Sequence, residues 1–181
     1  MNKQNMEDEL AIVNRENRII GWGRKDEIEY LNMSFRCVHI IVFLKNEMIV
    51  LPRFSMNKKK FPNMLTSSSI GHINRYEDYE NAAKRALWEC LGLKNNLLKN
   101  IGEFEIVYEK SLVFHKVYST ELDDEKKIVL NPMEFQGYEK KSIYTIEKEL
   151  SKGGYEYTNS FKNSFSFVKR EKRKLFAFNM V

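Results

Sequence analysis

The stretch that decides the fold runs from Gly71 to Leu93 and reads GHINRYEDYENAAKRALWECLGL. Apolar side chains recur in it at helical spacing, at Tyr79, Ala82, Ala83, Ala86, Leu87, Cys90 and Leu91. Glu77 and Asp78 suit the first turn of a helix, and Gly92 suits its C-terminal end. We therefore expect a helix from about Glu77 to Leu91 that buries one apolar face.

Extended segments precede and follow this helix. Strands are expected in two short pieces within 9–20, in a hairpin of Phe35–Leu44 and Met48–Arg53, along 64–73, at Ile101–Glu109 and Leu112–Thr120, and at Ile128–Leu130. Helices are expected at Ser142–Ser151 and Thr158–Arg170, and the closing LFAFNMV is either a last strand or a contact surface. This order predicts an α/β fold in which a mixed β-sheet is sandwiched between α-helices.

Length and composition point to a single domain over residues 1–181. A content of 43% hydrophobic and 30% charged residues is typical of soluble globular proteins. No apolar run approaches the roughly 20 residues of a membrane span, and the polar N-terminus does not read as a signal peptide. Cys37 and Cys90 lack metal or redox spacing, so we expect free thiols and a cytoplasmic location.

The chain carries a net charge of +5, and much of the excess lies in Lys58–Lys60 and in 169–174 (KREKRK). A basic surface could attract nucleic acid or a phosphate-bearing ligand. No nucleic-acid reading motif is present and acidic residues are interleaved, so a solvated surface is the preferred interpretation and nucleic acid is not an expected partner.

The central stretch resembles the signature box of the Nudix superfamily. The matching positions are Gly71, Glu77, Arg85, Leu87, Glu89, Gly92 and Leu93. The segments EDELAIVNRENRIIGWGRKDEI, FRCVHIIVFLKNEMIVLPRFS, FPNMLTSSSIGHI and GYEYTNSFKNSF resemble, in that order, the branch related to isopentenyl-diphosphate isomerase. The resemblance implies a Nudix fold and, for the family, hydrolysis of a diphosphate linked to another moiety.

The resemblance does not extend to the isomerase reaction. The isomerase attacks with a cysteine directly before the Gly-His pair, where this chain has Ile70. The isomerase metal site also uses a histidine at the position of Phe35. Only His72 is kept, and a lone histidine is more often structural than a ligand.

The resemblance implies Mg²⁺ or Mn²⁺, which the box holds with three glutamates on one helix face. Here Ala86 and Cys90 stand at two of those positions, which leaves Glu89 and the Gly71 carbonyl as metal ligands. Glu77 and Arg85 would pair to orient the loop, and Gly92 would end the helix. Cys90 is a soft ligand and a better buried hydrophobe than a nucleophile.

A second carboxylate could be recruited from elsewhere in the chain. Glu134, in a late loop, is the first choice as a catalytic residue beside Glu89, although an exposed loop glutamate is the alternative. Other carboxylates that could serve are Glu80, Glu103, Glu105 and Glu139.

A phosphorylated small molecule is the expected ligand, held by Arg53, Lys58, Lys60 and His72. A solvated loop is the alternative for the lysines, and Trp22, Trp88, Phe54 and Tyr108 could stack on a base or belong to the core. Three functions stay open: a divergent Nudix hydrolase, an inactive phosphate-ligand sensor, and a protein-interaction module that uses the C-terminal segment. A homodimer is possible, and no membrane partner is expected.

Overall fold

The computed structural model describes residues 9–45, 47–108 and 110–178, with side chains through Glu171. Within these residues an eight-stranded sheet contains β1 (Glu9–Val13), β2 (Ile19–Arg24), β3 (Ser34–Leu44), β4 (Met48–Phe54), β5 (Ser69–His72), β6 (Lys99–Tyr108), β7 (Ser111–Leu122) and β8 (Phe135–Ser142). The helices are α2 (Lys25–Tyr30), α3 (Tyr79–Leu91), α4 (Ile143–Ser151) and α5 (Asn159–Phe178), with a 3-10 turn η1 (Glu125–Lys127).

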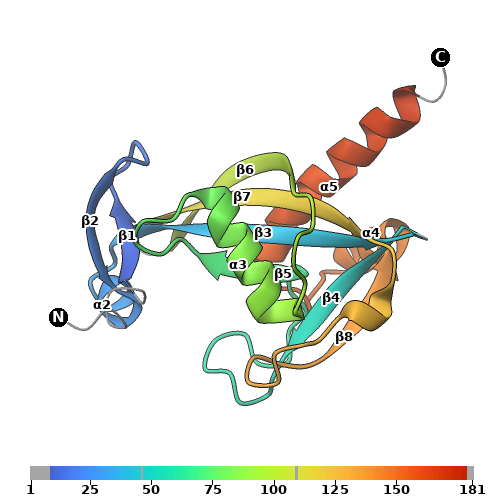
Figure 1. Cartoon of the computed structure of the whole chain (residues 1–181), viewed down its shortest axis with the longest axis horizontal. Helices are drawn as coiled ribbons and strands as arrows, with labels where there is room; N and C mark the ends of the chain where they lie inside the picture. The colour runs from blue at the N-terminus through green and yellow to red at the C-terminus, as the bar shows by residue number, and fades with distance from the viewer. Residues whose placement is uncertain (1–8, 46, 109, 179–181) are drawn as a thin grey trace.

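The long strand β3 runs through the middle of the sheet (Figure 1). It pairs in parallel with β7 from Phe35↔Val113 to Leu44↔Leu122. On its other side it pairs antiparallel with β1, β5 and β4 in succession. Its continuous apolar run from Val38 to Val42, interrupted only by His39, is typical of a strand that is covered on both faces.

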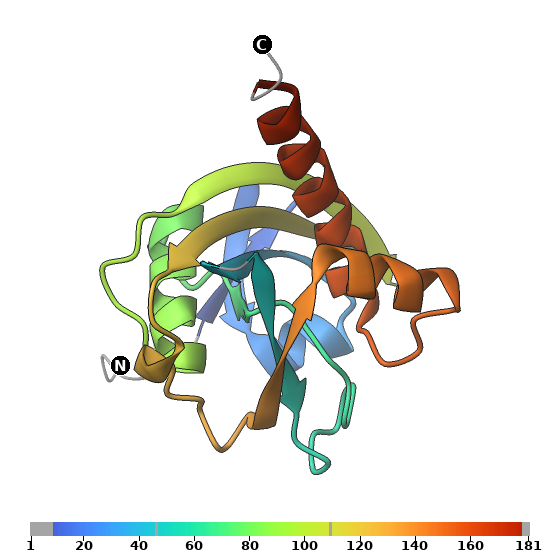
Figure 2. The same cartoon turned by 90° about the vertical axis from the view of Figure 1, so that its right-hand side faces the viewer.

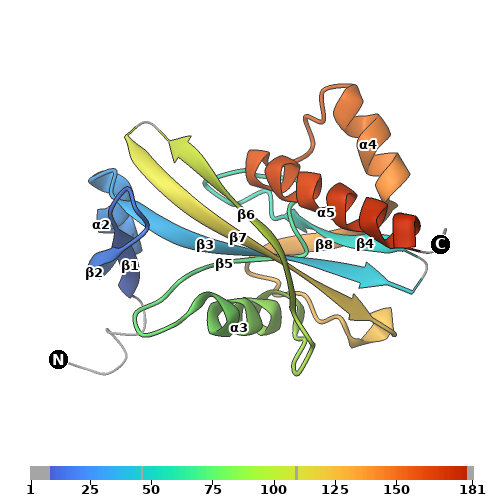
Figure 3. The same ribbon diagram turned by 90° about the horizontal axis from the view of Figure 1, so that it is seen from above.

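Helices cover both faces of the sheet. Helix α3 lies on one face, and α4 and α5 lie on the other (Figures 2 and 3). The α3 face buries Val38, Ile40 and Val42 of β3 against Ala82, Ala83, Ala86, Leu87, Cys90 and Leu91 of the helix. The α5 face buries Ile41, Ile49, Leu51 and Val117 against Phe161, Phe165 and Val168. The predicted α/β sandwich is thereby confirmed.

Helix α3 begins and ends where its sequence provides caps. The Asp78 side chain accepts a hydrogen bond from the backbone N–H of Asn81 at 2.7 Å, which satisfies one of the free donors of the first turn. Gly92 adopts the left-handed conformation with φ 69°, and its N–H donates to the Trp88 carbonyl at 2.8 Å. The helix therefore starts two residues after Glu77, which remains in the preceding loop.

Two expectations for the second half of the chain are wrong. Residues 128–130 are not a strand, because Val129 N–H donates to the Leu91 carbonyl and holds the segment against the end of α3. Of the two alternatives for 175–181, the strand is also wrong for 175–178, whose backbone continues α5; residues 179–181 lie outside the described part of the chain.

Two elements were not expected from the sequence. The charged segment Lys25–Tyr30 forms α2, which buries Ile28. Residues Phe135–Ser142 form β8, which pairs with β4 from Met48↔Ser142 to Phe54↔Phe135. In the described part of the chain, no helix is both long and apolar enough to cross a membrane.

Candidate functional site

An ion pair fixes the loop that enters α3. Arg85 Nε lies 2.7 Å from Glu77 Oε1 and Arg85 Nη2 lies 2.8 Å from Glu77 Oε2, so the two side chains meet as a fork. Arg85 Nη2 also donates to the His72 carbonyl at 2.8 Å. The hydrogen bonds to Glu77 raise the pKa of Arg85 above its usual value. The pair therefore ties the helix to the end of β5.

Gly71 is the point where α3 approaches the sheet most tightly. A Cβ atom placed on Gly71 would lie 2.7 Å from the Cβ of Ala86, which is closer than two carbon atoms can pack. Ala86 is completely buried. Glycine is required at position 71 because the helix leaves no room for a side chain there.

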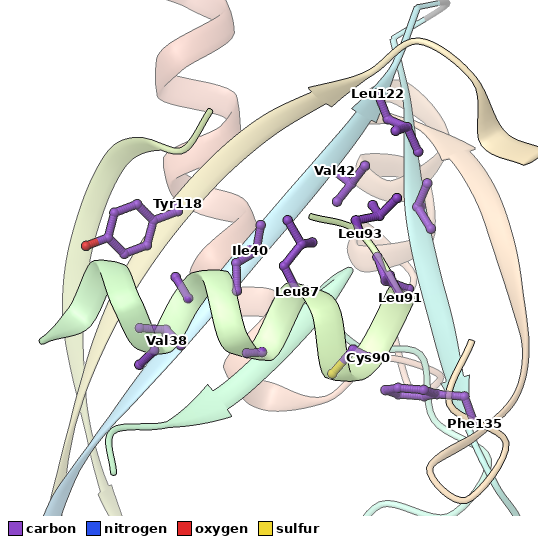
Figure 4. Packing of buried hydrophobic residues seen from close by; sticks show 14 of the residues in the cluster. Val38, Ile40, Val42, Leu87, Cys90, Leu91, Leu93, Tyr118, Leu122 and Phe135 are labelled. Atoms are coloured by element: carbon purple, nitrogen blue, oxygen red, sulfur yellow. The ribbon is translucent and has the colours of Figure 1, made fainter. Parts of the chain in front are cut away.

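The two box positions without glutamates lie in the core. Ala86 and Cys90 belong to the apolar cluster between α3 and the sheet, and Figure 4 shows Cys90 at the end of the helix with Phe135 nearby. The Cys90 thiol donates a weak hydrogen bond to the Ile70 carbonyl, with sulfur and oxygen 3.7 Å apart. Burial raises the pKa of this thiol, so it stays protonated and is a poor nucleophile.

The two carboxylates predicted to be catalytic both lie near Cys90. Their negative charges add to the effect of burial and raise the thiol pKa further. Glu89 is about half exposed, and its Oε2 lies 2.9 Å from Arg85 Nη1. Glu134 lies in the loop before β8, and its carboxylate forms an ion pair with Lys58. Segments 45 residues apart in the chain, at Glu89 and Glu134, thus flank one thiol.

The structure separates the residues predicted to bind a ligand. Lys58 lies with Glu134, whereas Lys60 Nζ lies 2.7 Å from Glu29 Oε2 of α2. Arg53 is occupied elsewhere: its Nε donates to Glu139 Oε1 at 3.1 Å and its Nη2 to Glu156 Oε2 at 3.0 Å. Of these basic side chains, Lys58 is the one that the structure brings to the Cys90 region, and the ligand-binding roles stay predictions.

His72 is partly buried, and its imidazole is neutral. Its ring centroid lies 5.5 Å from that of Phe35. Burial, together with the positive charges of Lys25 and Arg85, lowers the pKa of His72 to about 3. A neutral imidazole cannot hold a phosphate by charge, and the ligand-binding role of His72 stays a prediction.

A buried polar chain on the α5 face escaped the sequence reasoning. His39 Nδ1 lies 2.8 Å from Ser67 Oγ, and His39 Nε2 lies 3.0 Å from His115 Nδ1. The His115 ring stacks on Phe104 with centroids 4.6 Å apart, and its Nε2 has no hydrogen-bond partner among the described residues. A histidine within the apolar run of β3 and another directly after Leu112–Phe114 of β7 were the signal that could have revealed this chain.

Two surface cavities lie away from these carboxylates. The cavity of about 310 Å³ is lined by Gly92, Leu93, Lys94, Asn95, Asn96, Leu122 and Lys127. The cavity of about 540 Å³ is lined by Arg15, Glu16, Asn17, Tyr79, Glu103, Phe104, Glu105, Phe114 and His115. Neither cavity is lined by Glu89, Glu134 or Lys58.

Comparison with known proteins decides the family. A comparison with protein-family models found no match. The uncharacterized Nudix hydrolase all7351 of Nostoc sp. (strain PCC 7120) is 33% identical over 119 residues, which cover 64% of this chain and 70% of that protein. The chain belongs to the Nudix hydrolase family. The resemblance of its box to the family signature is thereby confirmed at the level of the family.

Solved structures share the fold of this Nudix hydrolase. DR0079 from Deinococcus radiodurans superposes with a TM-score of 0.73 at 20% identity, covering 86% of this chain and 96% of that one. The MutT protein from Methanosarcina mazei Go1 gives a TM-score of 0.64 at 18% identity over 77% of this chain and 95% of that one. An Ap4A hydrolase from C. elegans gives 0.59 at 14% identity over 78% and 99%.

Nudix hydrolases generally use divalent metal ions, and the donors near Cys90 can be compared with that need. In the described part of the chain, no group of three or more His, Cys, Asp or Glu residues is arranged to hold a metal. Mg²⁺ takes six oxygen ligands, whereas Glu89 and Glu134 provide carboxylates that are already paired with Arg85 and Lys58. These residues do not fit a resident metal ion. Their hard oxygens suit an ion that arrives with a ligand's own phosphates.

Proposed function

We propose that this Nudix hydrolase cleaves a diphosphate linkage in a small molecule, with a nucleoside-diphosphate-linked compound as the substrate class. The supporting observation is that the loop that carries Glu134 is joined to the end of the helix that carries Glu89, because Asn131 N–H donates to the Cys90 carbonyl at 3.1 Å and Glu134 N–H donates to the Asn131 carbonyl at 3.1 Å. Lys58 adds a cation at the same place. Two carboxylates and a lysine are the minimum set for activating water beside a phosphate.

In this proposal Glu134, Lys58 and Glu89 have different roles in the hydrolysis. A water oxygen bonds to phosphorus, the bridging P–O bond breaks, and the Glu134 carboxylate accepts the proton that the water loses. Lys58 holds the phosphate by its charge and keeps it in line with the water. Glu89, with the Gly71 carbonyl, would contribute oxygens to a Mg²⁺ or Mn²⁺ ion that neutralises phosphate charge when bound.

The test is phosphate release from a panel of diphosphate compounds with added Mg²⁺ or Mn²⁺. Glu134→Gln and Glu89→Gln should each lower kcat at least about 100-fold, which is a usual contribution of a general base or a charge-stabilising group. Glu80→Gln is the matched control, because Glu80 lies on the same helix in an exposed pair with Lys84. Activity that survives in Glu134→Gln would remove Glu134 from the reaction.

A second candidate is a Nudix fold that binds a phosphorylated ligand without turning it over. It is favoured by Ala86 and Cys90, which fill two box positions with buried, uncharged side chains. Thermal stabilisation by a diphosphate compound, with no phosphate released under either metal, would select this candidate over the hydrolase.

Further expectations stay predictions. They are the branch related to isopentenyl-diphosphate isomerase, the single domain over residues 1–181, the cytoplasmic location and the homodimer. The C-terminal interaction segment includes side chains from 172 onward, which lie outside the described part of the structure.

A further inference from the structure

The ion pair of Lys58 and Glu134 bridges two loops that meet over the end of α3. Lys58 belongs to the loop after β4, and Glu134 belongs to the loop before β8. A backbone hydrogen bond joins the loops beside the pair, because Ser55 N–H donates to the Glu134 carbonyl at 3.0 Å. The second loop is anchored to the helix, since Asn131 N–H donates to the Cys90 carbonyl at 3.1 Å. The ion pair therefore connects one loop to a loop that is fixed on α3.

A stacked pair of aromatic rings lies between this ion pair and the core. Phe54 and Phe135 stack with centroids 5.3 Å apart and planes inclined by 14°. Lys58 Nζ lies 5.5 Å from the Phe54 ring centroid. Phe54, Phe135 and Cys90 belong to one buried cluster, in which Cys90 is 8% exposed. The two loops begin and end at these rings, so we expect their separation to increase the exposure of the Cys90 thiol.

The exposure of the Lys58–Glu134 ion pair allows another anion to replace the Glu134 carboxylate. The side chains of Lys58 and Glu134 are 30% and 41% exposed, and ion pairs in contact with water contribute little to stability. A diphosphate brings several oxygens and more than one negative charge to an ammonium group, whereas a carboxylate brings one charge.

We propose that Lys58 is a positioning residue that exchanges partners: it holds Glu134 in the free protein, and a diphosphate group of the ligand displaces that carboxylate. Displacement frees Glu134 from its cation and loosens the two loops over Cys90. This inference rests on the proposed function only in that the ligand carries a diphosphate. It requires neither turnover nor a metal ion.

The exchange is tested by a double-mutant cycle with inorganic pyrophosphate, measured by calorimetry in EDTA. Lys58→Met should weaken binding, and Glu134→Gln should tighten it about tenfold, within the usual range of coupling between linked sites. In the Lys58→Met background the same Glu134→Gln change should alter the affinity less than twofold, because no ion pair is left to break. General repulsion between Glu134 and the ligand would act equally in both backgrounds.

Additive effects in the cycle would overturn the exchange, as would wild-type protein that does not bind pyrophosphate. Failure of the proposed function has a different signature, because it requires that no diphosphate compound of the metal-containing panel be cleaved. A protein that passes the cycle but cleaves nothing keeps the exchange and loses the hydrolase.

Cys90 reports loop opening without a ligand. In a Cys37→Ala background Cys90 is the only thiol, and its rate of alkylation by neutral iodoacetamide measures its accessibility. Lys58→Met should raise this rate several-fold, although an unpaired Glu134 raises the thiol pKa and would by itself slow the reaction. Lys59→Met removes the same charge from the neighbouring exposed residue and should leave the rate unchanged. Equal rates in the two variants would overturn the opening.

Discussion

The two faces of the sheet keep their polar side chains in different places. On the α3 face the charged groups Glu77 and Arg85 lie at the rim, and the interior positions Ala86 and Cys90 are small and uncharged. On the α5 face the interior itself is polar, because His39 and His115 are buried there in one hydrogen-bonded chain. The same sheet thus has small uncharged residues in the interior under α3, and two buried histidines beside the apolar cluster under α5.

This difference limits where chemistry can occur on α3. The family resemblance places carboxylates on the inner face of the helix, but in this chain that face packs on β5 and leaves no opening at Ala86. Near the C-terminal end of α3, Glu89 reaches solvent, and Glu134 lies in the loop that is hydrogen-bonded to that end. Any phosphate chemistry on this face must therefore take place at the rim.

The largest loss of stability is expected from Ala86→Glu, which places a carboxylate on the buried face of α3. Ala86 is completely buried opposite Gly71, so the new side chain overfills the space and brings an unpaired charge. We expect a loss of more than about 3 kcal/mol in the free energy of unfolding. Urea titration measures this loss, with Asn81→Glu at an exposed site of the same helix as the control. Wild-type stability in Ala86→Glu would mean that the helix face is open to solvent.

The α5 face should make the protein sensitive to mild acid. Burial lowers the pKa of His72 to about 3 and that of His115 to about 4, and it lowers the pKa of His39 well below its usual value. In the unfolded chain the histidine pKa values are near 6.5. As the pH falls, the unfolded chain therefore binds more protons than the folded chain, and the free energy of unfolding decreases. Each such histidine should cost about 2 kcal/mol between pH 6.5 and pH 5.

Urea titrations at pH 6.5 and pH 5 measure this acid sensitivity. His72→Gln is the informative variant, because the His72 ring makes no hydrogen bond among the described residues and the substitution removes one titrating group. The free energy of unfolding of this variant should vary less with pH than that of the wild type, because about one proton fewer is taken up on unfolding. A wild-type stability that is flat over this interval would show that the histidines titrate normally.

The sequence was sufficient for the features that depend on local pattern. The apolar spacing predicted α3, and its caps at Asp78 and Gly92 are encoded in neighbouring residues. Strand β8 was missed because FQGYEKKS has little apolar alternation. It becomes a strand by pairing with β4, whose paired residues lie 81 (Phe54↔Phe135) to 94 (Met48↔Ser142) positions earlier in the chain. Local sequence carries no trace of such a partner.

The candidate site was predictable in part for the same reason. Glu89 follows from its place on the helix, and the choice of Glu134 placed a carboxylate in the loop that does meet the helix end. The pairing of Glu134 with Lys58 joins residues 76 positions apart through two loops, and no periodicity encodes it. Arg53 and Lys60 were grouped with Lys58 by nearness in sequence, but alternation along β4 and the path of the loop direct them to other partners.

A smaller effect is expected at the rim of the α3 face, where Glu77→Gln removes the charge that faces Arg85. Glu77 accepts two hydrogen bonds from Arg85 and one from the Asn74 N–H, and its side chain is 20% exposed. Thermal unfolding should show a loss of about 1.5 kcal/mol, which is usual for hydrogen bonds to a charged group. Glu80→Gln, in the exposed pair with Lys84, should change stability by less than about 0.5 kcal/mol. Equal losses of stability in Glu77→Gln and Glu80→Gln would show that the Glu77–Arg85 pair contributes no more than an exposed ion pair.

The smallest loss of stability among these substitutions is expected from Arg53→Met. The same variant also tests whether the charges around β4 and β8 are separate from the ligand site. Arg53 ties β4 to Glu139 of β8 and to Glu156, and together with Lys141 it holds the pKa of Glu139 below its usual value against the effect of burial. Its loss should cost about 1 kcal/mol, because both carboxylates remain partly in water. Since this network does not include Glu134, pyrophosphate affinity in Arg53→Met should equal that of the wild type, whereas Lys58→Met should lose affinity. If calorimetry finds that both variants bind pyrophosphate equally weakly, Arg53 belongs to the ligand site. The distinction between a phosphate-binding rim and a structural charge network would then be wrong.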